Sequence, residues 1–67
     1  MKSNFEIRVF RDETTQYIPM HCTLHQAKKT IVPMAYAMVE QDVKAIELWL
    51  VTHTLEKRMC FIDVRGA

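Results

Sequence analysis

Apolar and polar residues alternate along two stretches in the first third of the chain. In residues 5–10, FEIRVF, the apolar side chains of Phe5, Ile7 and Val9 fall on one side, which is the period of a half-buried strand. Turn-forming residues follow in 11–15, RDETT, and the sequence QYIPMHC, 16–22, predicts a second strand. Because Pro19 has no N–H to donate to a ladder, we expect this second strand at a sheet edge.

The period of the pattern changes at Thr23. Residues 23–26, TLHQ, have the form of a capping box, in which a hydroxyl and a Gln three residues later cap each other's backbone N–H groups. The spacing behind it predicts a helix that ends within 40–42. Pro33 lies inside this run, and its ring clashes with the carbonyl of Lys29, so we expect a kink or two short helices. The apolar stripe of this helix consists of Leu24, Ala27, Ile31, Ala35 and Met38.

The last third of the chain predicts a β-hairpin. Residues 44–52, KAIELWLVT, alternate as a strand but also have good helix propensity. We favour a strand, because 58–64 is a second clear strand and only 53–57, HTLEK, lies between them. The predicted fold is a small α+β domain over residues 1–67. It has the order β-β-α-β-β, with one helix on one face of an antiparallel sheet.

One helix can cover only one face of such a sheet. The covered face is expected to hold Phe5, Ile7, Val9, Ile18, Met20, Ile46, Leu48, Leu50, Cys60, Ile62 and Val64. The opposite face is expected to hold Glu6, Arg8, Phe10, Tyr17, His21, Glu47, Trp49, Val51, Met59, Phe61 and Asp63.

The second of these faces carries several aromatic residues and a Met inside a charged rim, which is typical of a partner-binding surface. The alternative is that the rings are core, because another segment covers them or because the parity of a strand is reversed. We predict a protein partner here, bound by Phe10, Tyr17, Trp49, Met59, Phe61, Asp63 and Arg65.

Composition narrows the classes of function. The net charge of +1 gives no electrostatic reason to expect nucleic acid or an anionic membrane as partner. A 67-residue chain buries only about 60% of its unfolded surface, which leaves no room for a deep substrate pocket. The uncharged run 30–39 is far shorter than the roughly 20 residues of a membrane span. With two cysteines and no signal-like segment, we expect a cytoplasmic protein with free thiols.

Potential ligands for zinc and a potential nucleophile occur in HCTLH, 21–25, and further along at His53 and Cys60. The spacing contains neither C-x-x-C nor H-x-x-x-H, so we expect packed thiols and surface histidines, with no metal or cofactor. A Cys–His nucleophilic pair would also need a cleft, an orienting group and an oxyanion site. We therefore expect no enzymatic activity.

The final residues carry one motif. Cys60, Asp63, Arg65 and Gly66 spell C-x-x-D-x-R-G. This ending is similar to that of the Dmd antitoxins of T-even-like phages, and VKA at 43–45, the chain length and the order of elements agree loosely with that family. The resemblance implies a phage protein that acts in the host cytosol and sterically blocks a host endoribonuclease toxin without catalysis.

Three alternatives remain open. An anti-CRISPR-type inhibitor of another host defence effector would use the same kind of surface. A small single-stranded nucleic-acid-binding protein would combine Lys28 and Lys29 with stacking on the aromatic rings. Its phosphates would, however, face Glu6, Glu47 and Asp63. Weak self-association through the aromatic face is the third alternative.

Overall fold

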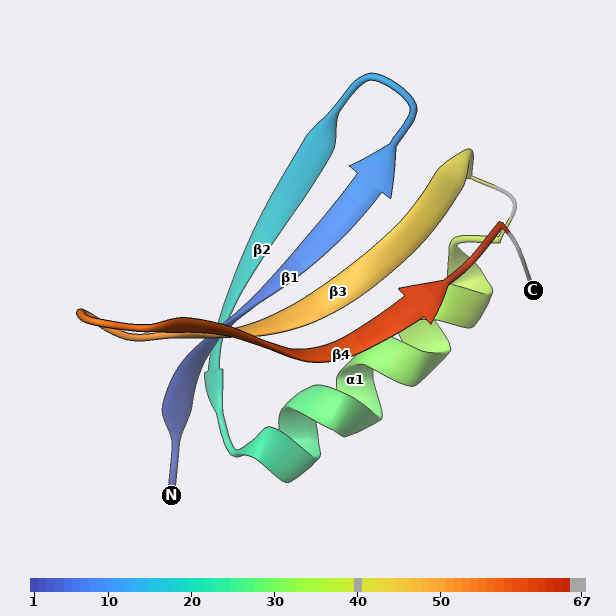
Figure 1. The fold of residues 1–67 in the computed structure, drawn as a ribbon. Helices are drawn as coiled ribbons and strands as arrows, with labels where there is room; N and C mark the ends of the chain where they lie inside the picture. The colour runs from blue at the N-terminus through green and yellow to red at the C-terminus, as the bar shows by residue number, and fades with distance from the viewer. Residues whose placement is uncertain (40, 66–67) are drawn as a thin grey trace.

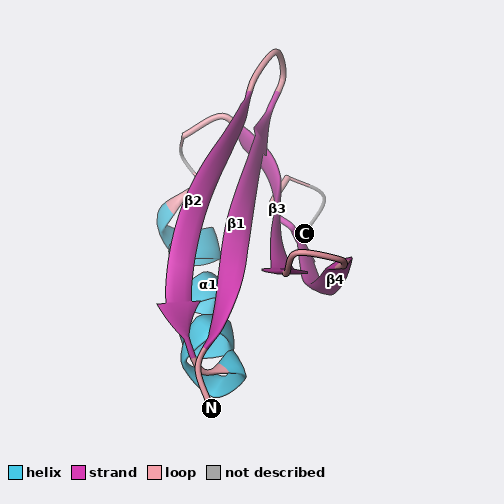
Figure 2. Cartoon of the chain, turned by 90° about the vertical axis from the view of Figure 1, so that its left-hand side faces the viewer, coloured by secondary structure: helices cyan, strands magenta, loops and turns pink. Residues whose placement is uncertain are grey.

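The computed structural model describes residues 1–39 and 41–65, and it has the predicted order β-β-α-β-β (Figure 1). The four strands form one antiparallel sheet in the order β2-β1-β3-β4. The helix lies against one face of this sheet (Figure 2), so the small α+β fold is confirmed. The elements are β1 (Ser3–Arg11), β2 (Thr15–Cys22), α1 (Leu24–Ala37), β3 (Val43–Val51) and β4 (Glu56–Asp63).

The capping box forms as predicted, and α1 is a single helix. The Thr23 hydroxyl accepts a hydrogen bond from the Gln26 N–H at 3.1 Å, and the Gln26 side chain accepts one from the Thr23 N–H at 3.0 Å. Of the two expectations for Pro33, the division into two short helices is wrong, because the 14 residues of α1 continue through it. Pro33 lies on the exposed side of α1, where water can bind the carbonyl that its ring leaves without a donor.

The end of the helix differs from the prediction. α1 ends at Ala37, before the predicted 40–42, and the N–H of Met38 caps it by donating to the carbonyls of Met34 and Ala35. Asp42 then adopts a φ of 57° directly before β3. This left-handed conformation is one that Asp tolerates better than most residues. It turns the chain back onto the sheet.

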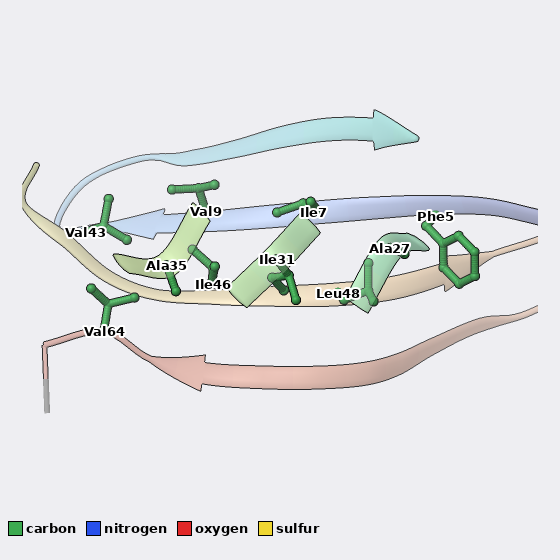
Figure 3. Close-up of a cluster of buried hydrophobic side chains, with 10 residues drawn as sticks. All are labelled: Phe5, Ile7, Val9, Ala27, Ile31, Ala35, Val43, Ile46, Leu48 and Val64. Atoms are coloured by element: carbon green, nitrogen blue, oxygen red, sulfur yellow. The ribbon is translucent and has the colours of Figure 1, made fainter. Parts of the chain in front are cut away.

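The core lies between α1 and the two central strands. Ala27, Ile31 and Ala35 are the buried residues of the helix, and Figure 3 shows them in a row along β1 and β3. The two alanines let the helix approach closely, while Ile31 fills the space between strands and helix. The fully buried side chains of the sheet are Ile7, Val9, Ile46 and Leu48, with Phe5, Val43 and Val64 at the ends of the cluster.

A β-bulge in β4 changes the face of one predicted residue. Leu48 pairs with Cys60, but Trp49 pairs with Arg58, so Met59 is the extra residue. Met59 packs against the core, and its predicted place on the opposite face is wrong. In a bulge, two residues of one strand lie opposite one residue of its neighbour. The alternation of side chains between the two faces of the sheet is therefore shifted by one position in the part of β4 that precedes Met59. The ladder then continues to Val51 and Glu56, two residues beyond the predicted start of this strand.

The other residues predicted beneath the helix are correctly placed. They pack against the core cluster as partly buried side chains and are Ile18, Met20, Leu50, Cys60 and Ile62. Among the described residues, no helix has the length and apolar character needed to cross a bilayer.

Replacement of Ile31 by Ala tests the core. Because Ile31 is fully buried against the sheet, Ile31→Ala should lower the free energy of unfolding by about 2–5 kcal/mol through the lost contacts and the cavity. The neighbouring Val32 is 47% exposed, and Val32→Ala should cost less than about 1 kcal/mol. Urea unfolding followed by circular dichroism measures both values. Equal losses for the two variants would contradict this packing.

Candidate protein-binding face

The sheet face turned away from α1, called the outer face below, is not covered by any described element (Figure 2). Residues that are paired across antiparallel strands point to the same side of the sheet. The pairings therefore assign the outer face to Glu6, Arg8, Phe10, Tyr17, Glu47, Trp49, Arg58, Phe61 and Asp63.

Arg8 lies at the centre of the outer face. Its guanidinium carbon is 4.1 Å from the centroid of the Trp49 ring and 5.7 Å from that of Tyr17. The Nε of Arg8 donates to the Glu6 carboxylate at 2.7 Å, and an Nη donates to the carboxylate of Glu56. A guanidinium suits this place, because it stacks on rings and binds carboxylates with the same planar group.

The hydrogen bond to Glu6, together with the one to Glu56, raises the pKa of Arg8 above its ordinary value although burial opposes the shift. Arg8 therefore keeps its charge.

Glu47 is the buried charge of the outer face. It is only 8% exposed, and its two oxygens accept hydrogen bonds from Trp49 Nε1 at 2.7 Å and from Arg58 Nη1 at 2.9 Å. A buried carboxylate is costly unless such partners compensate its lost hydration. Arg58 also lies 5.4 Å from the centroid of the Phe61 ring. These contacts join β3 and β4 on the outer face and hold Trp49 in one orientation.

The aromatic residues predicted to bind a partner do gather on the outer face, with different exposures. Tyr17 is 58% exposed and Phe61 is 50% exposed, and each is paired with a charged residue of the central strands, Arg8 and Glu47 respectively. Trp49 lies between them and is half-buried. The alternative that a reversed parity moves the rings into the core therefore fails for these three rings. The only partner-binding candidate that changes face is the non-aromatic Met59.

The remaining predicted residues lie at one end of the outer face. Phe10 is half-buried and paired with Ala45, and Ala45 is paired with the exposed Asp63. Arg65 follows β4, and its Nη1 donates to the Asp12 carboxylate at 2.9 Å. This ion pair connects the C-terminal segment to the loop between β1 and β2. Gly66, the last residue of the C-x-x-D-x-R-G motif, lies outside the described residues.

Two residues that sequence patterns missed contribute to the outer face. Glu56 was expected in the loop 53–57, and Arg58 was expected only as the first residue of the strand 58–64, with no face assigned to it. The bulge at Met59 places Arg58 opposite Trp49 and brings Glu56 to Arg8. No local signal in the sequence marks this bulge.

The residues considered for metal binding do not assemble. Cys22 and Cys60 are free and lie on opposite edge strands, and His21 bonds through Nδ1 to the side chain of Asn4 at 2.8 Å. In residues 1–39 and 41–65, no three His, Cys, Asp or Glu side chains form a group that could hold a metal ion.

The stacking of Arg8 on Trp49 can be tested by fluorescence, because Trp49 is the only tryptophan. Arg8→Ala uncovers the indole ring, so acrylamide should quench its emission more strongly and the emission should shift to longer wavelength. The control is Arg11→Ala, since Arg11 bonds to Gln16 and has no described contact with Trp49. Unchanged quenching in Arg8→Ala would contradict the stacked geometry.

The ion pair between Asp12 and Arg65 can be tested by measuring the pKa of the Asp12 carboxyl group. The hydrogen bond from Arg65 and its charge hold the pKa of Asp12 below its ordinary value. Because this folded-state pKa is depressed, any stabilisation from the pair is present above the unfolded-state pKa and is lost as the pH falls through the folded-state value. Arg65→Gln should raise the pKa of Asp12 towards the ordinary value of an aspartate, as followed by NMR. Lys29→Gln removes one positive charge elsewhere and should leave that pKa unchanged.

Comparisons with known proteins give no relatives. No protein-family model matches the chain, and neither the curated proteins nor the solved structures contain a significant match. The likeness of the C-terminal motif to Dmd antitoxins stays a prediction that rests on the sequence.

Proposed function

We propose that the protein is a small non-catalytic interaction module that binds a protein partner through its outer face. The observation that carries this proposal is the pair of exposed rings, Tyr17 and Phe61, on either side of Arg8 and Trp49. Tyr, Trp and Arg are the residue types that most often dominate the binding energy of protein interfaces. On a domain this small, an uncovered face of this composition favours binding over a purely structural role.

The outer face is also organised before any partner arrives. Arg8 is fixed by Glu6 and Glu56, and Trp49 is fixed by Arg8 and Glu47. Side chains that are already immobilised lose less conformational entropy on binding, which leaves more of the contact energy for affinity. A rigid central pair flanked by two exposed rings suits a partner with a shallow, complementary groove.

The charges of the outer face favour a protein over a nucleic acid. The guanidinium groups of Arg8 and Arg58 already donate to carboxylates of Glu6, Glu56 and Glu47. A phosphate backbone would have to replace these carboxylates and would be repelled by them. A protein can instead add hydrogen bonds around the network and fix its orientation through the charged rim.

For the identity of the partner, we propose a host endoribonuclease toxin of the class that Dmd antitoxins neutralise. Two charged residues of the C-terminal motif support this choice. Asp63 lies on the outer face, and Arg65 is held near the same end by Asp12. The mechanism is steric: the bound domain occupies the groove that the RNA substrate needs, and the protein breaks and forms no bonds.

Tyr17 and Tyr36 offer a matched pair of variants for this proposal. Tyr17 is on the outer face, whereas Tyr36 is on the helix and 77% exposed. Tyr17→Ala should weaken inhibition of RNA cleavage by the toxin about 30-fold or more, as expected for a hot-spot ring worth about 2 kcal/mol. Tyr36→Ala should inhibit like the unchanged protein. Equal effects of the two substitutions would rule out the outer face as the binding surface.

The dependence of binding on salt separates the classes of partner. Binding to the toxin should change little between 50 and 300 mM salt, since apolar rings supply most of the contact, whereas binding to single-stranded nucleic acid would weaken steeply. The protein could instead fail to inhibit the toxin and bind a purified CRISPR effector stoichiometrically. That result would contradict the proposed toxin target but would still support the outer face as the binding surface. Binding to neither protein would overturn the proposal.

A further inference from the structure

The two edges of the sheet are protected to different degrees. An edge strand exposes unpaired backbone N–H and C=O groups to any strand that approaches. The edge strand β2 contains Pro19 in its middle, and a proline at an edge blocks such pairing. The other edge strand, β4, has the sequence EKRMCFID and no proline. Lys57 and the bulge at Met59 protect the first half of β4, so its second half, from Cys60 to Asp63, is the part of the sheet edge at which another strand can add.

An apolar groove lies beside this edge, between β4 and α1. It has a volume of about 180 Å³, and Val32, Tyr36 and Val39 line it from the helix side while Ile62 and Val64 line it from the strand side. Exposed fractions of 47% for Val32, 77% for Tyr36 and 59% for Val39 show how little the chain itself covers this groove. Apolar residues grouped in this way on a small domain mark a contact surface.

The residues of β4 that point to the outer face and those that point to the core side match the residues of a second, antiparallel β4 in one register. Phe61 and Arg58 are on the outer face, opposite Glu47 and Trp49, whereas Ile62, Cys60 and Lys57 are opposite the core-side residues Ile46, Leu48 and Leu50. A second strand added at this edge must match these faces, since paired residues of two strands point to the same side of the sheet.

We propose that β4 pairs with β4 of a second copy of this chain, with the two-fold axis at Phe61. In this register Phe61 lies opposite the partner subunit's Phe61, and Ile62 lies opposite the partner subunit's Cys60. Because the bulge lets Arg58 and Met59 occupy one position, Asp63 then lies opposite the partner subunit's Arg58. Two aromatic rings, two apolar pairs and two opposite-charge pairs therefore meet across the axis.

Neighbouring registers lack this match. With the axis at Cys60, Asp63 would lie opposite the partner subunit's Glu56, and with the axis at Ile62, Arg65 would lie opposite the partner subunit's Arg58. Like charges directly opposite each other destabilise strand pairing. Asp63 already interacts within its own chain, and a carboxylate has about four acceptor sites for additional donors. The charges thus select the axis at Phe61.

Pairing of this kind joins two four-stranded sheets into one continuous sheet. The two-fold axis is perpendicular to the sheet, so both helices lie on the same side and their grooves face each other. Val32 and Tyr36 of each copy then lose exposure to water. Phe61 and Asp63 belong both to the outer face and to this edge, whereas Tyr17 lies on β2, at the far edge, and stays accessible in the dimer.

Disulfide trapping tests the register. In a background with Cys22→Ser and Cys60→Ser, Phe61→Cys places a thiol on the axis, and opposed residues of antiparallel strands have Cα atoms about 4.5–5.5 Å apart, within disulfide range. The matched control is Asp63→Cys in the same background, since residue 63 is opposite position 58 and not itself. Under mild oxidation Phe61→Cys should form covalent dimers at least tenfold faster than Asp63→Cys. Equal rates would overturn the register.

Sedimentation equilibrium of the unchanged protein tests the dimer itself. The protein should sediment as a dimer at micromolar to millimolar concentration, and Phe61→Lys, which sets two ammonium groups against each other, should sediment as a monomer with an unchanged circular dichroism spectrum. Tyr17→Ala should still form the dimer although it loses toxin inhibition. A monomer at all concentrations would overturn the inference and leave the proposed function untouched.

Discussion

A helix of 14 residues covers only one face of a four-stranded sheet, and this constraint decides how the rest of the domain is stabilised. On the covered face, burial of aliphatic side chains suffices, and Ile31 with the two buried alanines of α1 completes the core. On the outer face the chain supplies no second layer among its described residues. Stability there has to come from contacts within the plane of the sheet.

Arg8 and Glu47 provide those contacts. They are paired across the two central strands, and both contact Trp49. Arg8 stacks on its indole ring, and Glu47 accepts a hydrogen bond from its N–H. The apolar part of the ring is thereby shielded and its N–H is satisfied, which permits a tryptophan on a face without a covering element. The same arrangement leaves Tyr17 and Phe61 projecting on either side.

The bulge at Met59 links the two surfaces of the molecule. It brings Arg58 onto the outer face, where Arg58 satisfies Glu47, and it moves Met59 towards the core. It also sets the sequence of faces along the β4 edge. One inserted residue therefore affects the outer face, which we propose binds a toxin, and the edge, which we propose binds a second copy. The two surfaces share Phe61 and Asp63, whereas Tyr17 belongs to the outer face alone.

Periodicity in the sequence was sufficient to predict the element order and nearly all of the core, because alternation and the three-to-four spacing directly reflect burial. The residues TLHQ predicted the capping box at Thr23, and Pro19 predicted the edge position of β2. It also predicted which aromatic residues lie away from the helix. It could not predict that α1 continues through Pro33, since the cost of proline depends on whether the freed carbonyl faces water. The place of Met59, the contacts of Arg58 and Glu56, and the order β2-β1-β3-β4 were decided only by tertiary structure. Bulges and strand neighbours arise from contacts between segments distant in the chain, and local patterns carry no record of them.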